Sequence, residues 1–268
     1  MRFFLVIVLS ICSLSAYDAI NGKVLLLEFN AEQSLALSKN GLNIPLLPHP
    51  TDAAKKIAYI AVSYRQHDPI QLLYTTTQGK QKLPLHITQG AYQKEILAVE
   101  PSKVSPPKEA MEQIKQESQE AHKIYQTFTP KRYWTLPYAM PIHSTITSDY
   151  GNARIFNNTL QSYHSGTDFR ASVGTPILAS NDGVVVLSKT RYYAGGSIVI
   201  DHGEGIYSVY YHLSSRSLHV GDHVKQGDVV GLSGATGRVT GPHLHFGFMV
   251  QDIPVDPLDF IRKVNALF

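Results

Sequence analysis

Histidines and one aspartate gather in three short segments in the second half of the chain. The segments cover residues 163–168, 210–214 and 240–246. Imidazole nitrogens and carboxylate oxygens are ligands of zinc, and a zinc ion with three protein ligands keeps a fourth position open for water. A water molecule held in that position is activated as a nucleophile near neutral pH. The three segments together therefore predict a hydrolytic metal site.

The segment 240–246 reads as a strand. His243 and His245 alternate with Leu244 and Phe246. Side chains two residues apart on a strand share one face, at a spacing of about 6.6 Å, so both imidazoles face one site while the apolar pair faces a core. This geometry suits two metal ligands, or one ligand beside a catalytic partner.

His164 and Asp168 need a bend in the chain to reach one metal. On a straight strand their Cα atoms would lie about 13 Å apart, whereas zinc binds its donors at about 2.0–2.2 Å. Gly166 lies between them, and glycine tolerates backbone angles that other residues avoid. We therefore expect a bend at Gly166. Hydrolysis also needs a group that accepts and donates protons, and the remaining histidines are candidates for this role.

The first part of the chain predicts a separate β domain. Residues 17–104 contain short apolar stretches at 23–29, 57–64, 72–77 and 95–99, divided by turn signals such as Asn40-Gly41 and Asp68-Pro69. Several strands at this spacing favour a small β-sandwich, immunoglobulin-like in form. No catalytic group of residues is evident in this region.

A helix is expected next, within residues 105–132. It starts after Pro106-Pro107, and apolar residues recur at three- and four-residue steps, at Met111, Ile114, Ala121, Tyr125 and Phe128. The pattern is too short for a coiled coil and predicts a linker helix packed on a neighbouring domain. Strand and glycine-turn signals then fill residues 133–268, which predicts a mainly β protein that ends in an antiparallel β catalytic domain.

Composition excludes several classes of protein. Lysine and arginine number 24 against 21 aspartates and glutamates, and this net charge of +3 does not indicate a nucleic-acid-binding surface. Hydrophobic residues make up 43% of the chain, which predicts a folded protein. The single cysteine, Cys12, excludes a disulfide framework and any metal site built from several cysteines.

Residues 1–16 predict a cleaved signal peptide. Arg2 is followed by an apolar run and then by the small residues Ser13, Ser15 and Ala16. The run is about half the ~20 residues that a spanning helix needs, and the bulky Ile11 before Cys12 argues against a lipoprotein. We therefore expect an exported protein, periplasmic or extracellular, that loses Cys12 with the signal and has no membrane span afterwards.

These residues resemble the lysostaphin/LytM-type zinc metallopeptidases, which cut the peptides of peptidoglycan. The resemblance covers about 146–257 and rests on residues 148–154, 164–168, 174–176, 182–184, 211–214, 220–222 with Val224 and Gly227, 236–237 and 240–246. It implies a compact antiparallel β domain with its site in a groove. It also implies one zinc ion held by His164, Asp168 and His245, with His212 and His243 as catalytic histidines. Which of these two activates water and which stabilises the tetrahedral intermediate stays open.

The function expected on this basis is a zinc endopeptidase, associated with the cell wall, that hydrolyses the peptide cross-links of bacterial peptidoglycan with a metal-bound water. The cleaved bond could be a D-alanyl–diaminopimelate link or a glycine–glycine bridge, and the balance with carboxypeptidase activity is also open. Four tyrosines are candidates for the groove wall, although tyrosines in β domains often pack on sheet faces: Tyr163, Tyr192, Tyr193 and Tyr211.

Three other functions fit parts of the sequence. A non-enzymatic protein could bind peptidoglycan and activate another cell-wall hydrolase. A general extracellular metalloprotease would use the same chemistry on soluble proteins. Two histidines and one carboxylate also form the iron site of non-haem oxygenases, although two further histidines and an export signal favour hydrolysis.

Overall fold

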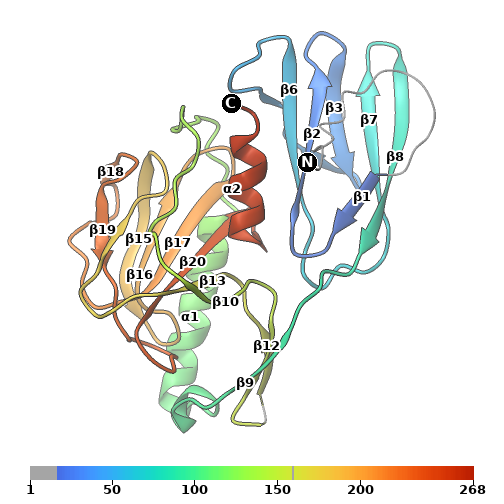
Figure 1. Ribbon diagram of the computed structural model, residues 1–268. Helices are drawn as coiled ribbons and strands as arrows, with labels where there is room; N and C mark the ends of the chain where they lie inside the picture. Colours follow the sequence, from blue (N-terminus) through green and yellow to red (C-terminus); the bar gives the residue numbers. More distant parts are fainter. Residues whose placement is uncertain (1–16, 159) are drawn as a thin grey trace. The chain divides into compact units, whose positions relative to one another are not determined.

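The computed structural model describes residues 17–158 and 160–268 (Figure 1), so the predicted signal peptide and Cys12 lie outside the described residues. The described chain divides into two compact units, residues 17–90 with 262–268 and residues 91–261. Both are built mainly of strands, which confirms the predicted fold class. The predicted domain bounds at residues 104 and 132 stay a proposal.

The first unit consists of two sheets around one core. Its strands are β1 (Tyr17–Ile20), β2 (Val24–Asn30), β3 (Ser34–Lys39), β4 (Leu42–Ile44), β5 (Leu47–Pro48), β6 (Lys55–Ala61), β7 (Ile70–Thr76) and β8 (Gly79–Thr88). One sheet has the order β1-β8-β7-β3-β4 and the other β2-β6-β5. Leu27 and Ile60 of the smaller sheet share a buried cluster with Leu37 and Leu72 of the larger. The immunoglobulin-like form of this unit stays a prediction.

The second unit is organised around an eight-stranded sheet. Its main path runs β10-β13-β20-β17-β16-β15-β18, and β21 pairs with β20. Its strands are β10 (Ile146–Ser148), β13 (Thr167–Arg170), β15 (Gly183–Arg191), β16 (Gly195–Asp201), β17 (Ile206–Leu213), β18 (His223–Val224), β20 (His243–Val250) and β21 (Ile253–Val255).

Two smaller sheets and two α-helices complete the described elements. One sheet has the order β12-β11-β9 and the other pairs β14 with β19. The bounds are β9 (Lys94–Leu97), η1 (Pro101–Lys103), α1 (Lys108–Tyr125), β11 (Ala153–Phe156), β12 (Leu160–Tyr163), β14 (Pro176–Leu178), β19 (Val229–Leu232) and α2 (Pro257–Asn265). No helix among the described residues is both long enough and apolar enough to cross a bilayer.

Helix α1 packs on the large sheet of its own unit. It starts directly after Pro107, within the range that the sequence predicts. Tyr125 is buried with Leu187, Val199 and Tyr207 of three neighbouring strands. Ala121 and Ile124 pack against the same cluster, whereas Met111 near the start of the helix is 54% exposed. The C-terminal part of the helix therefore covers the sheet, as expected for a packed helix.

Strand β20 carries the core and the site on opposite faces. Leu244, Phe246 and Phe248 are completely buried, and Phe246 and Phe248 contact each other edge-on at 5.4 Å between ring centroids. His243 and His245 alternate with them on the strand. The predicted alternation is thus confirmed, and burial of the apolar face fixes the direction in which the histidines point.

His202 is a buried histidine of the core, directly after β16. Its Nδ1 lies 2.7 Å from the carbonyl oxygen of Asp182, and its Nε2 lies 2.8 Å from Ser208 Oγ. Burial lowers the pKa of His202 from 6.5 to about 4. The folded protein therefore holds this ring neutral over a range in which the unfolded chain binds a proton.

We expect His202 to make folding sensitive to mild acid. Its contribution to stability is complete above pH 6.5 and is lost as the pH falls towards 4, because only the unfolded chain gains the proton in that window. Between pH 7 and 4, the advantage of the wild type over His202→Gln should shrink by about 3 kcal/mol. Urea unfolding over this range measures it, with the exposed His67→Gln as control; a constant difference would refute the assignment.

Candidate metal centre and groove

The register between β13 and β20 sets two of the predicted ligands face to face. The strands pair antiparallel, with Asp168 opposite His245 and Arg170 opposite His243. Directly opposed residues have Cβ atoms about 4.5–5.5 Å apart. A carboxylate and an imidazole at such positions can therefore reach one ion without any distortion of the sheet.

His164 completes a close triangle of donor atoms. Its Nε2 lies 2.9 Å from Asp168 Oδ1 and 2.9 Å from His245 Nδ1, and those two atoms lie 2.9 Å from each other. All three residues are buried. Tetrahedral zinc with donors at 2.0–2.1 Å spaces them roughly 3.3 Å apart, so the triangle is of the size that one zinc ion spans.

Residue 166 must be a glycine because neighbouring atoms leave no room for a side chain. A Cβ at this position would lie 2.5 Å from the carbonyl oxygen of Phe246 and 2.6 Å from His245 Nε2. Its φ lies outside the left-handed region, so the predicted reason, unusual backbone angles, does not apply. The chain between His164 and Asp168 instead passes so close to β20 that a side chain would displace His245.

Hydrogen bonds fix the tautomer of His164. Its Nδ1 lies 2.9 Å from the carbonyl oxygen of Asp149, a group that can only accept, so Nδ1 carries the proton and donates it. Its other ring nitrogen, Nε2, faces Asp168 Oδ1 and His245 Nδ1. A hydrogen bond at one ring nitrogen that orients the other is typical of a metal-binding histidine.

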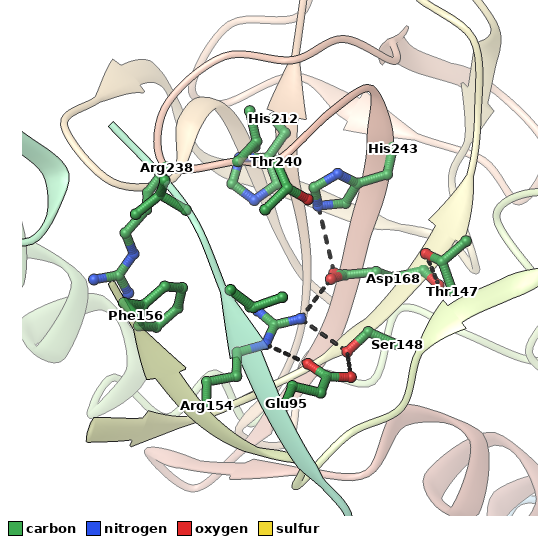
Figure 2. Close-up of a pocket in the computed structure, with 13 residues that line it drawn as sticks. Glu95, Thr147, Ser148, Arg154, Phe156, Asp168, His212, Arg238, Thr240 and His243 are labelled. Atoms are coloured by element: carbon green, nitrogen blue, oxygen red, sulfur yellow. Dashed lines mark hydrogen bonds and ion pairs between the residues drawn. The ribbon is translucent and has the colours of Figure 1, made fainter. Parts of the chain in front are cut away.

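Arg154 and Glu95 form a charged support behind the ligands (Figure 2). Arg154 Nη2 donates to Asp168 Oδ2 at 2.7 Å, and Arg154 Nε donates to Glu95 Oε2 at 3.1 Å. Ser148 Oγ donates to Glu95 Oε1 at 2.8 Å and lies 3.0 Å from His164 Nδ1. Glu95 thus orients two side chains that each contact a predicted ligand.

The pKa values of the two acids reflect this network. Burial alone would raise the pKa of Asp168, but His164 and His245 outweigh it and hold the pKa well below its usual value. Burial also acts to raise the pKa of Glu95, and hydrogen bonds from Asn152, Ser148 and Arg154 lower it on balance. Both carboxylates are therefore charged at neutral pH.

The two predicted catalytic histidines converge on the same triangle. His243 Nε2 lies 3.7 Å from Asp168 Oδ1, and the rings of His212 and His243 lie 4.8 Å apart. His212 Nδ1 donates to the carbonyl oxygen of Thr236 at 2.8 Å, and His243 Nδ1 donates to that of Gly241 at 2.8 Å. Each ring therefore keeps Nε2 free to accept a proton.

His212 reaches this position through an unusual backbone angle. Its φ is +64°, in the left-handed region that few residues other than glycine adopt. Successive side chains on a strand normally point to opposite faces, yet the Tyr211 ring stacks on His245 at 5.3 Å while His212 contacts His243. The left-handed residue brings both side chains to the site.

Burial keeps His212 neutral. It is the largest cause of a pKa well below 6.5, and the neighbouring His243 and His245 lower the pKa further. A neutral ring with Nε2 unprotonated is a proton acceptor at neutral pH. The geometry of His212 and its protonation state are thus suited to the same task.

The groove beside the triangle has two lobes. The first lies between Glu95 and Arg154 on one side and Thr240 and His243 on the other. Tyr163, Tyr193 and Tyr211 line the second lobe, together with His164 and His245. Of the four candidate tyrosines, Tyr192 instead donates its hydroxyl to the carbonyl oxygen of Ser102 at 2.9 Å.

Glu95 is the residue that sequence reasoning missed. It lies on β9, in a stretch assigned from sequence to the N-terminal β domain, where no catalytic group was expected. Strand β9 pairs parallel with β11, with Glu95 beside Arg154. The isolated glutamate carries no local signal of this partner, since about sixty residues separate the two strands.

The donor atoms of His164, Asp168 and His245 form a triangle that could hold one metal ion, and the rings of His212 and His243 lie beside it. This arrangement is of the kind found in hydrolytic metal centres of the metallopeptidase class. Residues 162–257 match peptidase family M23. The chain therefore carries a domain of this family, in agreement with the resemblance seen in the sequence.

Several known proteins are similar to this chain. The peptidoglycan DD-endopeptidase ShyA of Vibrio cholerae is 47% identical over 95 residues, which are 35% of this chain and 22% of ShyA. The DD-carboxypeptidase/endopeptidase Mpg of Neisseria meningitidis is 41% identical over the same shares of each chain. The chain thus spans less than a quarter of the length of these relatives.

One solved structure resembles most of the chain. It is a Pseudomonas aeruginosa protein assigned to peptidase M23, with 25% identity and a TM-score of 0.67, and the match covers 90% of this chain and 94% of that one. The described fold therefore recurs in a protein of nearly the same extent.

Two substitutions on strand β20 test which histidine binds the metal and which acts as a catalytic partner. His245→Ala removes a donor of the triangle, so we expect zinc affinity to fall by more than roughly 100-fold, beyond the loss typical of outer partners. His243→Ala, two residues away on the same face, should weaken zinc by less than about tenfold. Competition with a chromophoric chelator measures both, and equal losses would contradict the assignment.

Proposed function

We propose that this protein is a zinc-dependent endopeptidase that hydrolyses peptide cross-links of bacterial peptidoglycan. The observation that carries the proposal is the convergence of His164, Asp168 and His245 within 2.9 Å of one another beside His212 and His243. The names of the relatives support the substrate, because ShyA, ShyB and ShyC are named peptidoglycan DD-endopeptidases.

The triangle would hold one zinc ion through His164 Nε2, Asp168 Oδ1 and His245 Nδ1. When bound, the metal supplies Lewis-acid activation of water. The protein's own part is to orient and to move protons. Arg154 holds the second oxygen of Asp168, so the carboxylate is turned with Oδ1 towards the histidines.

His212 and His243 would share the proton transfers. Each has its Nδ1 proton committed to a backbone carbonyl, and each keeps Nε2 on the groove side. One of them would take the proton of the attacking water on Nε2 and pass it to the leaving amine. The other would stabilise the charge that develops on the scissile carbonyl once its Nε2 carries a proton that it can donate.

Export fits this substrate. The sequence of residues 1–16 has the charged start, apolar run and small residues of a signal peptide. Peptidoglycan lies outside the cytoplasmic membrane, so we propose that the protein works in the periplasm or at the cell surface.

Digestion of purified cross-linked muropeptides tests the function. Wild type should convert dimers to monomers, while His245→Ala should be inactive because it lacks a metal ligand. His212→Ala should keep zinc and lose about 100-fold or more in kcat, the usual contribution of a general base. Liquid chromatography of the products measures all three.

Three results would overturn the proposal. Equal cleavage by wild type and His245→Ala would refute the metal assignment. Cleavage of casein without cleavage of muropeptides would identify a general protease. Binding of muropeptides without any cleavage by the wild type would favour an activator of another hydrolase.

A further inference from the structure

Two arginines line the groove, and their charges are balanced very differently. Arg154 lies between two carboxylates, those of Glu95 and Asp168. Arg238 borders both lobes, yet among the described residues its guanidinium has no ion pair and no hydrogen bond. An unbalanced cation thus remains in the wall of the groove.

Aromatic rings hold the Arg238 guanidinium in place. Its central carbon lies 4.4 Å from the ring centroid of Phe156 and 4.5 Å from that of Tyr193. Figure 2 shows the side chain extending alongside Phe156, apart from the dashed network around Arg154. Contact with ring faces leaves the in-plane N–H groups available, and their planar arrangement matches a carboxylate.

The backbone of Arg238 is fixed by the loop that also fixes His212. The Arg238 N–H donates to the carbonyl oxygen of Tyr193 at 2.8 Å, and the carbonyl of Thr236 accepts the His212 proton. Gly237 between them has a φ of +82°, and a Cβ there would lie 2.4 Å from the Tyr193 oxygen. Arg238 and His212 thus come from one loop region and line the same two lobes of the groove.

The surroundings of Arg238 favour the arrival of an anion. Burial lowers the pKa of Arg238, and the nearby positive charge of Arg154 acts in the same direction. A guanidinium nevertheless stays protonated in proteins. The free-energy cost of desolvating the Arg238 charge in the groove wall therefore remains. A carboxylate that enters the groove relieves it, whereas a neutral group does not.

We propose that Arg238 is the carboxylate-binding subsite of the groove and selects cross-links with a free carboxylate beside the scissile bond. This inference rests on the proposed endopeptidase function and narrows its substrate. In a D-alanyl–diaminopimelate link, the residue on the nitrogen side of the bond carries such a carboxylate. A glycine–glycine bridge carries none, so the protein should prefer the first substrate.

A pair of synthetic cross-linked peptides tests this subsite. The two differ only in that one has the carboxylate beside the scissile bond and the other a carboxamide. Wild type should cleave the carboxylate peptide with a kcat/KM roughly 10- to 100-fold higher, mainly through KM, as expected for a hydrogen-bonded ion pair. Arg238→Gln should cleave both peptides with the same kcat/KM, because the preference for the carboxylate is lost.

Two further variants separate this role from folding and from general charge. Arg238→Lys keeps the charge without the planar donors and should retain part of the preference. Arg216→Gln removes a cation that borders neither lobe and should retain all of it. An unchanged preference in Arg238→Gln would overturn the proposal.

Binding to zinc-free protein gives a readout that does not depend on activity. Titration calorimetry with the carboxylate peptide should show at least tenfold tighter binding to wild type than to Arg238→Gln, and no such difference with the carboxamide. If wild type cleaves neither peptide, the proposed function fails, and calorimetry alone decides on the subsite. If it cleaves both equally, only the subsite is refuted.

Discussion

The antiparallel pairing of β13 with β20 places Asp168 opposite His245, and the rest of the site is arranged around that pair. Because side chains alternate along a strand, a slip of one residue would turn His245 into the core and bring Leu244 to the groove. Phe246 and Phe248, both completely buried, make such a slip costly. The hydrophobic core of the large sheet thus fixes the positions of Asp168 and His245 in the candidate metal centre.

Close packing at one glycine and a left-handed backbone conformation at one histidine bring the other candidate site residues to that pair. Gly166 lets the chain with His164 pass against β20, and the left-handed His212 brings one more imidazole to the same face. The charges beside the pair are also balanced, because Glu95 pairs with Arg154 and Arg154 in turn orients Asp168. Arg238, held between two rings, keeps its charge for a ligand. A few short contacts around these residues therefore determine the geometry of the candidate site.

Local sequence patterns predicted several of the elements that position the candidate site. The alternation at 243–246 predicted the strand and its two-faced character, and the apolar spacing at 111–128 predicted helix α1. The five candidate site residues were expected from their spacing and the family resemblance, and the structure brings them close together. Contacts between distant segments were not accessible: the pairing of β9 with β11 leaves no local signal, so Glu95 was missed. The reason for Gly166 was also wrong, because the crowding comes from β20.

We propose that three side chains hold one zinc ion and leave its fourth position open beside two histidines. Anomalous X-ray diffraction at the zinc edge, from crystals of the zinc-loaded protein, tests it directly. We predict one zinc ion with His164 Nε2, Asp168 Oδ1 and His245 Nδ1 at about 2.0–2.2 Å and no fourth protein ligand. A zinc ion bound by other residues, or with His212 or His243 as a fourth ligand, would refute this zinc site.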